Sequence, residues 1–271
     1  MKLGTVIELY PQGIILPVDK PYRWTSADVI RKIKFAACRH FGKKNLKVGH
    51  AGTLDPLATG VLLVCIGKAT KLAEELQRSP KQYLAGVSFG ATTPSYDREK
   101  AIDARFPADG ITREAVERML QDFVGEQEQV APLFSAKSVD GVRAYEMARK
   151  AYRQAAGSGE GFDHSGAELL TRQKILISAL ELVSFGEPVS QMEQYKPNPR
   201  INVTDISHEE GLVNAEILVD CSKGTYIRAL ARDWGEALGS GAFLNNLRRT
   251  RCGDFRVEEA LSIEEAMECF G

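Results

Sequence analysis

Apolar and polar residues follow two different spacings along this chain, and the spacing predicts the type of each element. Short runs rich in apolar residues and bounded by turn-forming residues are typical of buried strands. The first such run, GIILPVD, extends from Gly13 to Asp19. Runs of this kind predict strands over residues 13–19, 61–66, 83–89, 173–185, 200–206 and 212–220.

Helical spacing occurs between these runs. In the segment that follows the first strand, Val29, Ile33 and Ala37 fall on one face, and Thr25 before them is a suitable N-cap. Gly42 would end this helix. The same reasoning predicts helices over residues 27–41, 69–76, 112–123 and 226–238.

The order of these elements indicates the fold class. Strands occur in consecutive runs as well as in alternation with helices, which favours an α+β fold over a doubly wound parallel sheet. No clear linker divides the chain, so we expect one compact domain over residues 1–271. The segment 154–166, QAAGSGEGFDHSG, is small and polar, and we expect a mobile insertion there.

Composition narrows the functional classes. The 271 residues are 44% hydrophobic and 26% charged, which is typical of a globular protein. No run approaches the roughly 20 apolar residues that span a bilayer, and the N-terminus lacks the apolar core of a signal peptide, so we expect a cytoplasmic protein without membrane contact. The five cysteines and four histidines are scattered, so we expect reduced thiols and no metal site.

Basic residues are concentrated in two segments, although the net charge is only −1. Residues 31–50 hold seven Lys or Arg and no acidic residue, and residues 223–251 hold six against two acidic residues. Two such segments form one phosphate-binding surface if the fold brings them together. Alternatively, each is a solvated helix face, and charge alone favours that interpretation.

The residues best suited to catalysis follow the helix predicted over 27–41, which we call the basic helix because it carries part of the first basic segment. Residues 49–60 read GHAGTLDPLATG and place one carboxylate, Asp55, near one imidazole, His50. A loop held by glycine and proline can aim a side chain into a cleft while its backbone approaches a ligand. A structural interpretation is also open, since Asp before Pro commonly initiates a turn. From these residues alone, the turn is favoured.

The stretch GHAGTLDPLATGVL closely resembles the signature loop of the TruB-type tRNA pseudouridine synthases. Further segments resemble the same family, and they occur in the family's order. They are Lys81-Gln82-Tyr83, VAPLFSAK at 130–137 with Gly141 and Tyr145, CSKGTYIR at 221–228, and Gly241-Ala242 with LRRT at 247–250. Together the motifs extend over most of the chain, which makes coincidence implausible.

The resemblance implies a pseudouridine-synthase fold, with a mixed, mostly antiparallel central sheet flanked by helices. It also implies conversion of uridine 55 in the T-loop of tRNA to pseudouridine. This isomerisation breaks the C1′–N1 bond, turns the base and joins C1′ to C5, so nothing is oxidised or donated and we expect no cofactor. The uridine is stacked inside folded tRNA and has to be flipped out before it reacts.

The resemblance assigns three catalytic residues. Asp55 is the essential carboxylate, which attacks sugar C1′ or base C6. A buried carboxylate stays ionised beside a cation, and Arg228 is the expected partner in a two-pronged salt bridge. Tyr83 is expected to stack on the uracil and to act as, or relay to, a general base for the C5 proton. Without the motifs, Arg228 would pass for a surface arginine and Tyr83 for a core residue.

Five further positions are carried over as substrate contacts. Tyr226 is expected to hydrogen-bond or wall the flipped base, and Leu247 to form an apolar side of its pocket. His50 lies where the family places a residue that fills the space vacated by flipping. Lys20 and Lys71 are expected to bind RNA or to support the site, with a solvated surface as the alternative.

Arg248 and Arg249, together with the basic helix, are expected to hold phosphates and so to position the RNA without reading its sequence. The expected partner is the T-arm stem-loop of tRNA, bound by a monomer. A second hypothesis is a non-catalytic RNA-binding protein or tRNA-folding chaperone on the same scaffold. The presence of Asp55, Tyr83 and Arg228 argues against that alternative.

The chain departs from the family pattern at several points. Arg23 replaces the glycine of the N-terminal Lys-Pro-x-Gly block, and Ala131 replaces the first proline of a Pro-Pro pair. Too few residues follow Phe255 for a C-terminal RNA-binding domain of the PUA type. We therefore expect the catalytic domain alone to recognise the T-arm, with an affinity that falls steeply with salt.

Overall fold

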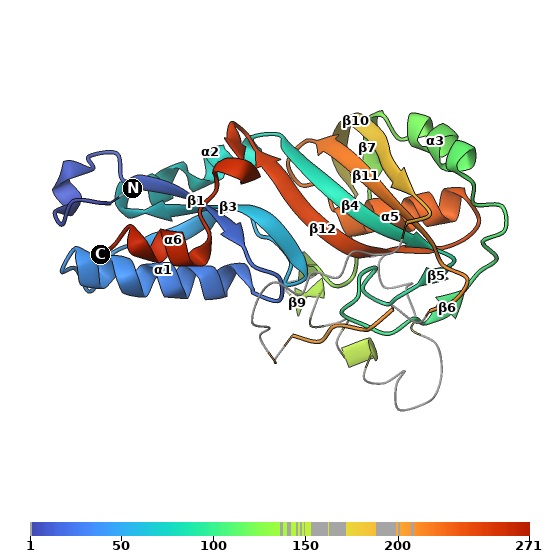
Figure 1. Ribbon diagram of the computed structural model, residues 1–271, viewed down its shortest axis with the longest axis horizontal. Helices are drawn as coiled ribbons and strands as arrows, with labels where there is room; N and C mark the ends of the chain where they lie inside the picture. Colours follow the sequence, from blue (N-terminus) through green and yellow to red (C-terminus); the bar gives the residue numbers. More distant parts are fainter. Residues whose placement is uncertain are drawn as a thin grey trace. The chain divides into compact units, whose positions relative to one another are not determined.

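The structure is a computed structural model, and its residues group into two compact units (Figure 1). It describes residues 2–135, 138–139, 142–144, 146, 148, 150–152, 162, 172–187, 199, 201–206 and 209–271. The first unit comprises Met1–Tyr83, Gln191–Ile201 and Leu247–Gly271, and the second comprises Leu84–Ser190 and Asn202–Asn246. Strands β4 (Lys81–Phe89) and β12 (Ala242–Cys252) each contribute residues to both units. The expectation of a single domain stays a prediction.

Strand β3 (Ala58–Ile66) is the centre of the sheet in the first unit, and all nine of its residues are buried. It pairs antiparallel with β1 (Ile14–Lys20) along one edge and with β2 (Val48–Ala51) along the other. The second edge also pairs in parallel with β12, where Leu247 lies opposite Ala58. The residues that link β2 to β3 are therefore held next to β12.

Helix α1 (Ser26–His40) begins at the predicted N-cap. The Thr25 hydroxyl accepts the Asp28 backbone N–H, and the Asp28 carboxylate accepts the Thr25 backbone N–H, which forms a capping box. Helix α6 (Ile263–Glu268) lies beside α1 in Figure 1. The remaining elements of this unit are η1 (Ile7–Leu9), η2 (Gly67–Leu72), α2 (Ala73–Arg78), β13 (Phe255–Arg256) and η4 (Val257–Glu259).

In the second unit the strand order is β4-β11-β10-β7, where β11 is Val213–Cys221, β10 is Gln173–Phe185 and β7 is Gly125–Gln129. Helix α3 (Arg113–Asp122) packs on β10 and on α5 (Ile227–Ala237). Trp234 of α5 is fully buried there. Shorter strands are β5 (Ala91–Thr92), β6 (Ala104–Arg105), β8 (Ser138–Val139) and β9 (Val142–Arg143).

The predicted fold class is confirmed. The pairings of β3 with β1 and β2, and of β10 with β7 and β11, are antiparallel, whereas β3 and β12 run parallel. Helices flank this mixed sheet. Within the described residues, no helix combines the length and apolar character needed to cross a membrane.

The strand predicted over 200–206 is wrong for the described residues 201–206, which have no regular secondary structure. Thr204 donates its backbone N–H to the Arg98 carbonyl oxygen at 2.7 Å, and its own carbonyl oxygen accepts from Arg98 Nε at 3.0 Å. These bonds tie Thr204 to Arg98, and Arg23 Nη2 donates to the Ile201 carbonyl oxygen at 2.7 Å, so side chains hold the segment. Ile206 is still buried, against Ala91 and Phe243, so the apolar alternation reflects the packing of an irregular segment.

Residues 49–60, predicted as a loop, form one only in part. Gly49, His50 and Ala51 belong to β2, and β3 begins at Ala58, which leaves residues 52–57 as the connection. The predicted mobile insertion at 154–166 lies, apart from Phe162, outside the described residues.

Candidate functional site

In the connection between β2 and β3, Asp55 lies between two buried leucine residues. Leu54 and Leu57 are buried, Thr53 is exposed and Asp55 is half-buried. The Ala58 backbone N–H donates to the Asp55 carbonyl oxygen at 3.1 Å, which closes a tight turn around Pro56. The carboxylate thus lies at the edge of the core, on a short turn anchored by leucines on both sides.

A buried serine at the start of α1 holds this turn. The Ser26 hydroxyl accepts the Leu54 backbone N–H at 3.0 Å and lies 3.0 Å from the Leu54 carbonyl oxygen, to which it donates. Ser26 is 3% exposed. Since one hydroxyl satisfies both backbone groups of the residue before Asp55, the N-terminus of α1 fixes the position of the turn.

Lys20, at the end of β1, is fully buried beneath the same turn. Its Nζ donates to the carbonyl oxygens of Pro21 at 2.9 Å, Trp24 at 2.6 Å and Pro56 at 3.3 Å. Burial lowers the pKa of Lys20 to about 7, and the carboxylate of Asp55 partly opposes this by raising it. Of the two roles expected for Lys20, the structure favours support of the site over direct RNA contact.

Arg249 of β12 holds the start of the turn and is 1% exposed. Its Nε donates to the Val61 carbonyl oxygen at 2.7 Å, Nη2 to Gly52 at 3.2 Å and Nη1 to Thr53 at 3.5 Å. This differs from the expected surface role in phosphate binding. A guanidinium without exposed surface, bound to three carbonyls, supports the protein backbone instead.

Arg248, the next residue, points to the other face of β12, as alternation along a strand requires. It forms a two-pronged ion pair with Asp19, with distances of 2.7 Å from Nη2 to Oδ2 and 3.1 Å from Nη1 to Oδ1. Nη1 also donates to the Thr59 hydroxyl at 3.2 Å. Its side chain is 28% exposed, so it retains some surface, but Asp19 already balances its charge.

His50 lies in β2 opposite Val64 and is half-buried. Burial and, secondarily, the charge of Arg249 lower the pKa of His50 below its usual value. Its Nδ1 is buried and has no hydrogen-bond partner among the described residues. Both effects favour the neutral form of the imidazole.

Two of the other predicted residues also belong to the first unit. Tyr83 of β4 and Leu247 of β12 are each 9% exposed. Leu247 lies opposite Ala58, the first residue after the Asp55 turn. Lys71 is exposed on η2, beyond the opposite end of β3, so the structure does not bring it to the Asp55 turn.

Arg228 lies on α5 in the second unit and is 6% exposed. Its Nη1 donates to the Ser95 carbonyl oxygen at 3.1 Å and its Nη2 to that of Phe134 at 2.9 Å. Nε lies 3.7 Å from Oδ2 of Asp97. Because Asp55 belongs to the first unit, the expected salt bridge between Asp55 and Arg228 stays a prediction.

Tyr226 is the N-cap of α5, and Gln129 fixes its backbone. The side-chain amide of Gln129 accepts the Tyr226 N–H at 2.9 Å and donates to the Tyr226 carbonyl oxygen at 3.1 Å. The Tyr226 ring packs against the cluster that includes Leu133 and Phe134. The sequence does not predict this role of Gln129, because nothing in GEQEQ distinguishes Gln129 from Gln127.

Similarity to known proteins is extensive. The family model described as TruB family pseudouridylate synthase (N terminal domain) matches residues 39–157. The tRNA pseudouridine synthase B of Phocaeicola vulgatus is 48% identical over 259 residues, which cover 96% of this chain and 94% of the relative. The tRNA pseudouridine synthase B of Flavobacterium johnsoniae is 39% identical over 265 residues, with 96% and 99% covered.

Solved structures share the fold at lower identity. A chain from the crystal structure of a Cbf5-Nop10-Gar1 complex matches with a TM-score of 0.61 and 23% identity, over 97% of this chain and 56% of that chain. A chain from the archaeal box H/ACA sRNP Nop10-Cbf5 complex matches with a TM-score of 0.57 and 21% identity, over 97% and 56%. This chain therefore spans little more than half the length of those proteins.

Proposed function

The chain belongs to the TruB family of pseudouridylate synthases, and from that premise we propose that it isomerises uridine 55 in the T-loop of tRNA, with Asp55 as the nucleophile. A pseudouridine synthase is an isomerase. The relatives described above are named tRNA pseudouridine synthase B, which supports tRNA as the substrate.

The observation that carries the proposal is the support of the Asp55 turn. Hydrogen bonds from Ser26, Lys20 and Arg249 reach residues 52–56 from α1, β1 and β12. A nucleophile reacts efficiently when it is held close to the position it occupies in the transition state. Support from several rigid elements provides this positioning.

The proposed reaction leaves the composition of the nucleotide unchanged. The ionised Asp55 carboxylate forms a transient bond to the substrate, the C1′–N1 bond breaks, and the base turns. The C1′–C5 bond then forms, the C5 proton leaves, N1 gains a proton, and Asp55 is released as a carboxylate. No redox equivalent or group donor enters this balance.

We assign the remaining catalytic roles to Tyr83 and Arg228. Tyr83 stacks on the uracil and removes or relays the C5 proton. Arg228 pairs with Asp55 and keeps it ionised. The contacts of Arg228 with Ser95 and Phe134 orient its guanidinium within the second unit.

Flipping of the uridine out of the T-loop is also part of the proposal. Flipping removes stacking interactions worth a few kcal/mol, and an aromatic ring that fills the vacated space recovers part of this energy. His50 suits this role because its ring is half-buried and its lowered pKa favours the neutral imidazole, which stacks on bases.

Tritium release from T-arm RNA labelled at uracil C5 tests the proposal. We expect release by the wild-type protein and none by Asp55→Asn, which keeps the size of the side chain and removes its charge. Asp109→Asn, at an exposed position, is the matched control and should release tritium at the wild-type rate. RNA binding without release by the wild type would overturn the proposal and favour a chaperone.

A further inference from the structure

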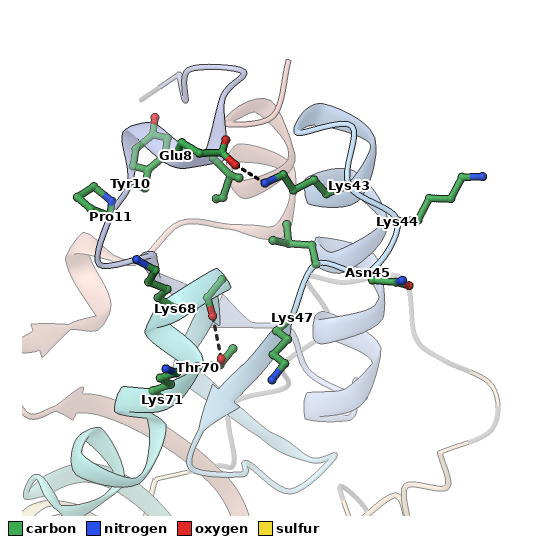
Figure 2. Close-up of a pocket in the computed structure, with 13 residues that line it drawn as sticks. Glu8, Tyr10, Pro11, Lys43, Lys44, Asn45, Lys47, Lys68, Thr70 and Lys71 are labelled. Carbon is green, nitrogen blue, oxygen red and sulfur yellow. Dashed lines mark hydrogen bonds and ion pairs between the residues drawn. The ribbon is translucent and has the colours of Figure 1, made fainter.

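A second candidate binding site lies in the first unit, away from the Asp55 turn. A cavity of about 680 Å³ opens between η1, the residues that follow α1, and η2 (Figure 2). Its lining comes from three segments, which are residues 7–11, 43–47 and 67–71. None of the residues placed at the Asp55 turn lines it.

The rim of this cavity is strongly basic. Five lysines line it, all of them exposed, and Glu8 is the one acidic residue of the lining. Lys43 forms an ion pair with Glu8. Lys47, Lys68 and Lys71 have no ion-pair partner among the described residues. Their charges are therefore available to an anion.

The wall of the cavity is apolar and contains a fixed aromatic ring. Ile7, Pro11 and the buried Leu46 line it together with Tyr10. The Tyr10 hydroxyl accepts the Gly4 backbone N–H at 2.8 Å, and the Tyr10 and Phe41 rings form an edge-to-face pair with 6.2 Å between their centroids. An apolar wall with a rigid aromatic ring beneath a lysine rim suits a nucleobase with its flanking phosphates.

The position of the cavity separates it from the site of the reaction. The Asp55 turn adjoins Ala58 at one end of β3, and the cavity adjoins Gly67, just after the other end. A strand rises about 3.3 Å per residue, so the eight steps of β3 place the two sites roughly 26 Å apart. One nucleotide does not reach both, whereas a folded RNA does.

We infer that this cavity binds an unstacked nucleotide of the RNA substrate outside the reactive loop, with its base against the Tyr10 wall and its phosphates on the lysine rim. The inference rests on the proposed function for the identity of the RNA. It adds a second point of attachment, which fixes how the substrate lies along β3.

The test uses the full chain, full-length tRNA and the double variant Lys47→Gln/Lys68→Gln. Each lost phosphate contact reduces the slope of log K against log salt by about 1, so this variant should reduce it by about 2. The ratio of the variant's Kd to the wild-type Kd should then fall about fourfold for each doubling of the salt concentration. The rate of tritium release at saturating tRNA should match the wild type. Arg113→Gln/Arg118→Gln on the exposed face of α3 removes the same charge elsewhere and should leave the slope unchanged.

A second measurement tests the base contact. Cross-linking of tRNA that contains 4-thiouridine should label the peptide with residues 7–11 in the wild type, and labelling should fall in the lysine double variant. An unchanged salt slope together with no label at 7–11 would overturn the inference. The inference would also be overturned if inorganic phosphate filled the cavity and tRNA still bound with unchanged affinity. The site would then bind a free anion and not the RNA.

The two proposals fail in different ways. If the wild type releases no tritium, the proposed function fails. If the wild type releases tritium while the lysine variant binds tRNA with the wild-type Kd and salt slope, only the second site fails.

Discussion

Nη2 of Arg249 donates a hydrogen bond to the carbonyl oxygen of Gly52 at 3.2 Å, so a buried cation on β12 holds the start of the turn that carries Asp55. The same guanidinium bonds to Val61 in β3. A charge in this position serves the backbone around the candidate nucleophile rather than the phosphates of RNA.

Arg249→Lys should therefore lower the tritium-release rate at saturating RNA without changing the salt slope of binding. Lysine keeps the charge but lacks the planar fork that reaches three carbonyls. A carbonyl left without a donor costs about 1–3 kcal/mol, so if lysine keeps one of the three bonds we expect a loss of about 2–6 kcal/mol in the free energy of unfolding. Urea titration measures this loss. Arg256→Lys, at an exposed position, is the control, and an equal effect of both substitutions would contradict the assigned role.

The buried Lys20 should make stability depend on pH. Its pKa is about 7 in the folded chain and about 10.4 in an unfolded one. Between these values the unfolded state binds more protons, so stability rises with pH. Relative to Lys20→Met, which removes the group, the wild type should gain about 2 kcal/mol in the free energy of unfolding from pH 7 to pH 9. Below pH 7 both states are protonated and the group adds no slope. Urea titrations that gave the same difference at pH 7 and pH 9 would disprove the burial effect.

Gly60 should not tolerate a side chain. It has a φ of 100°, and a Cβ at this position would lie 2.2 Å from the Arg249 carbonyl oxygen. Gly60→Ala combines backbone strain with overpacking, so we expect a loss of about 2–5 kcal/mol in the free energy of unfolding. Gly110→Ala is the matched control, because a Cβ there meets nothing within 4 Å. Thermal unfolding of the two variants tests this, and a Gly60→Ala protein as stable as Gly110→Ala would refute the close packing of β3 on β12.

The Asp97 carboxylate should stabilise the fold around the buried Arg228 guanidinium. The Asp97 carboxylate accepts from the Ser95 hydroxyl at 2.6 Å and from the Glu99 backbone N–H at 2.9 Å, and it lies 3.7 Å from Arg228 Nε. Asp97→Asn leaves the guanidinium without this buried anion, which should cost about 1–3 kcal/mol in the free energy of unfolding. Asp220→Asn on β11, which is only partly buried, provides a control for the same chemical change. Similar urea midpoints for the two variants would argue against a role for the Asp97 pair.

Elements with a strong local pattern were predictable from the sequence. The helix expected over 27–41 is Ser26–His40, the helix over 226–238 is Ile227–Ala237, and the strand over 173–185 has those bounds. In the first case the signals were a cap and a regular apolar face. These features act within a few residues, so they can be read without knowledge of the rest of the fold.

The long strand β12 was not predicted, because its support comes from distant residues. Its sequence, AFLNNLRRTRC, changes from apolar to basic without alternation. Arg249 is nevertheless buried, because Val61, Gly52 and Thr53 supply carbonyls. Burial of a charge depends on such partners, and they become visible only in the folded chain.

The sequence suggests candidate site residues but not the contacts that hold them. The signature loop points to Asp55, whose catalytic role stays a prediction, whereas Ser26 gave no signal as its support beyond that of a helix cap. Arg249 was expected to hold phosphates but is buried, and Lys20, expected either to bind RNA or to support the site, is buried as well. Sequence resemblance therefore proposes which residues take part, and the hydrogen bonds of the structure show which backbone groups Ser26, Lys20 and Arg249 contact.

Two consecutive residues of β12 bind different partners on opposite faces of the strand: Arg248 pairs with Asp19, and Arg249 bonds to the Asp55 turn. Insertion of a single residue before this pair would turn each arginine to the wrong face of the strand. One cation would then be buried without carbonyls, and the other would leave Asp19 unbalanced. Length variation among functional relatives should therefore be absent from the stretch between Leu247 and Arg249 and should be found in the connecting loops.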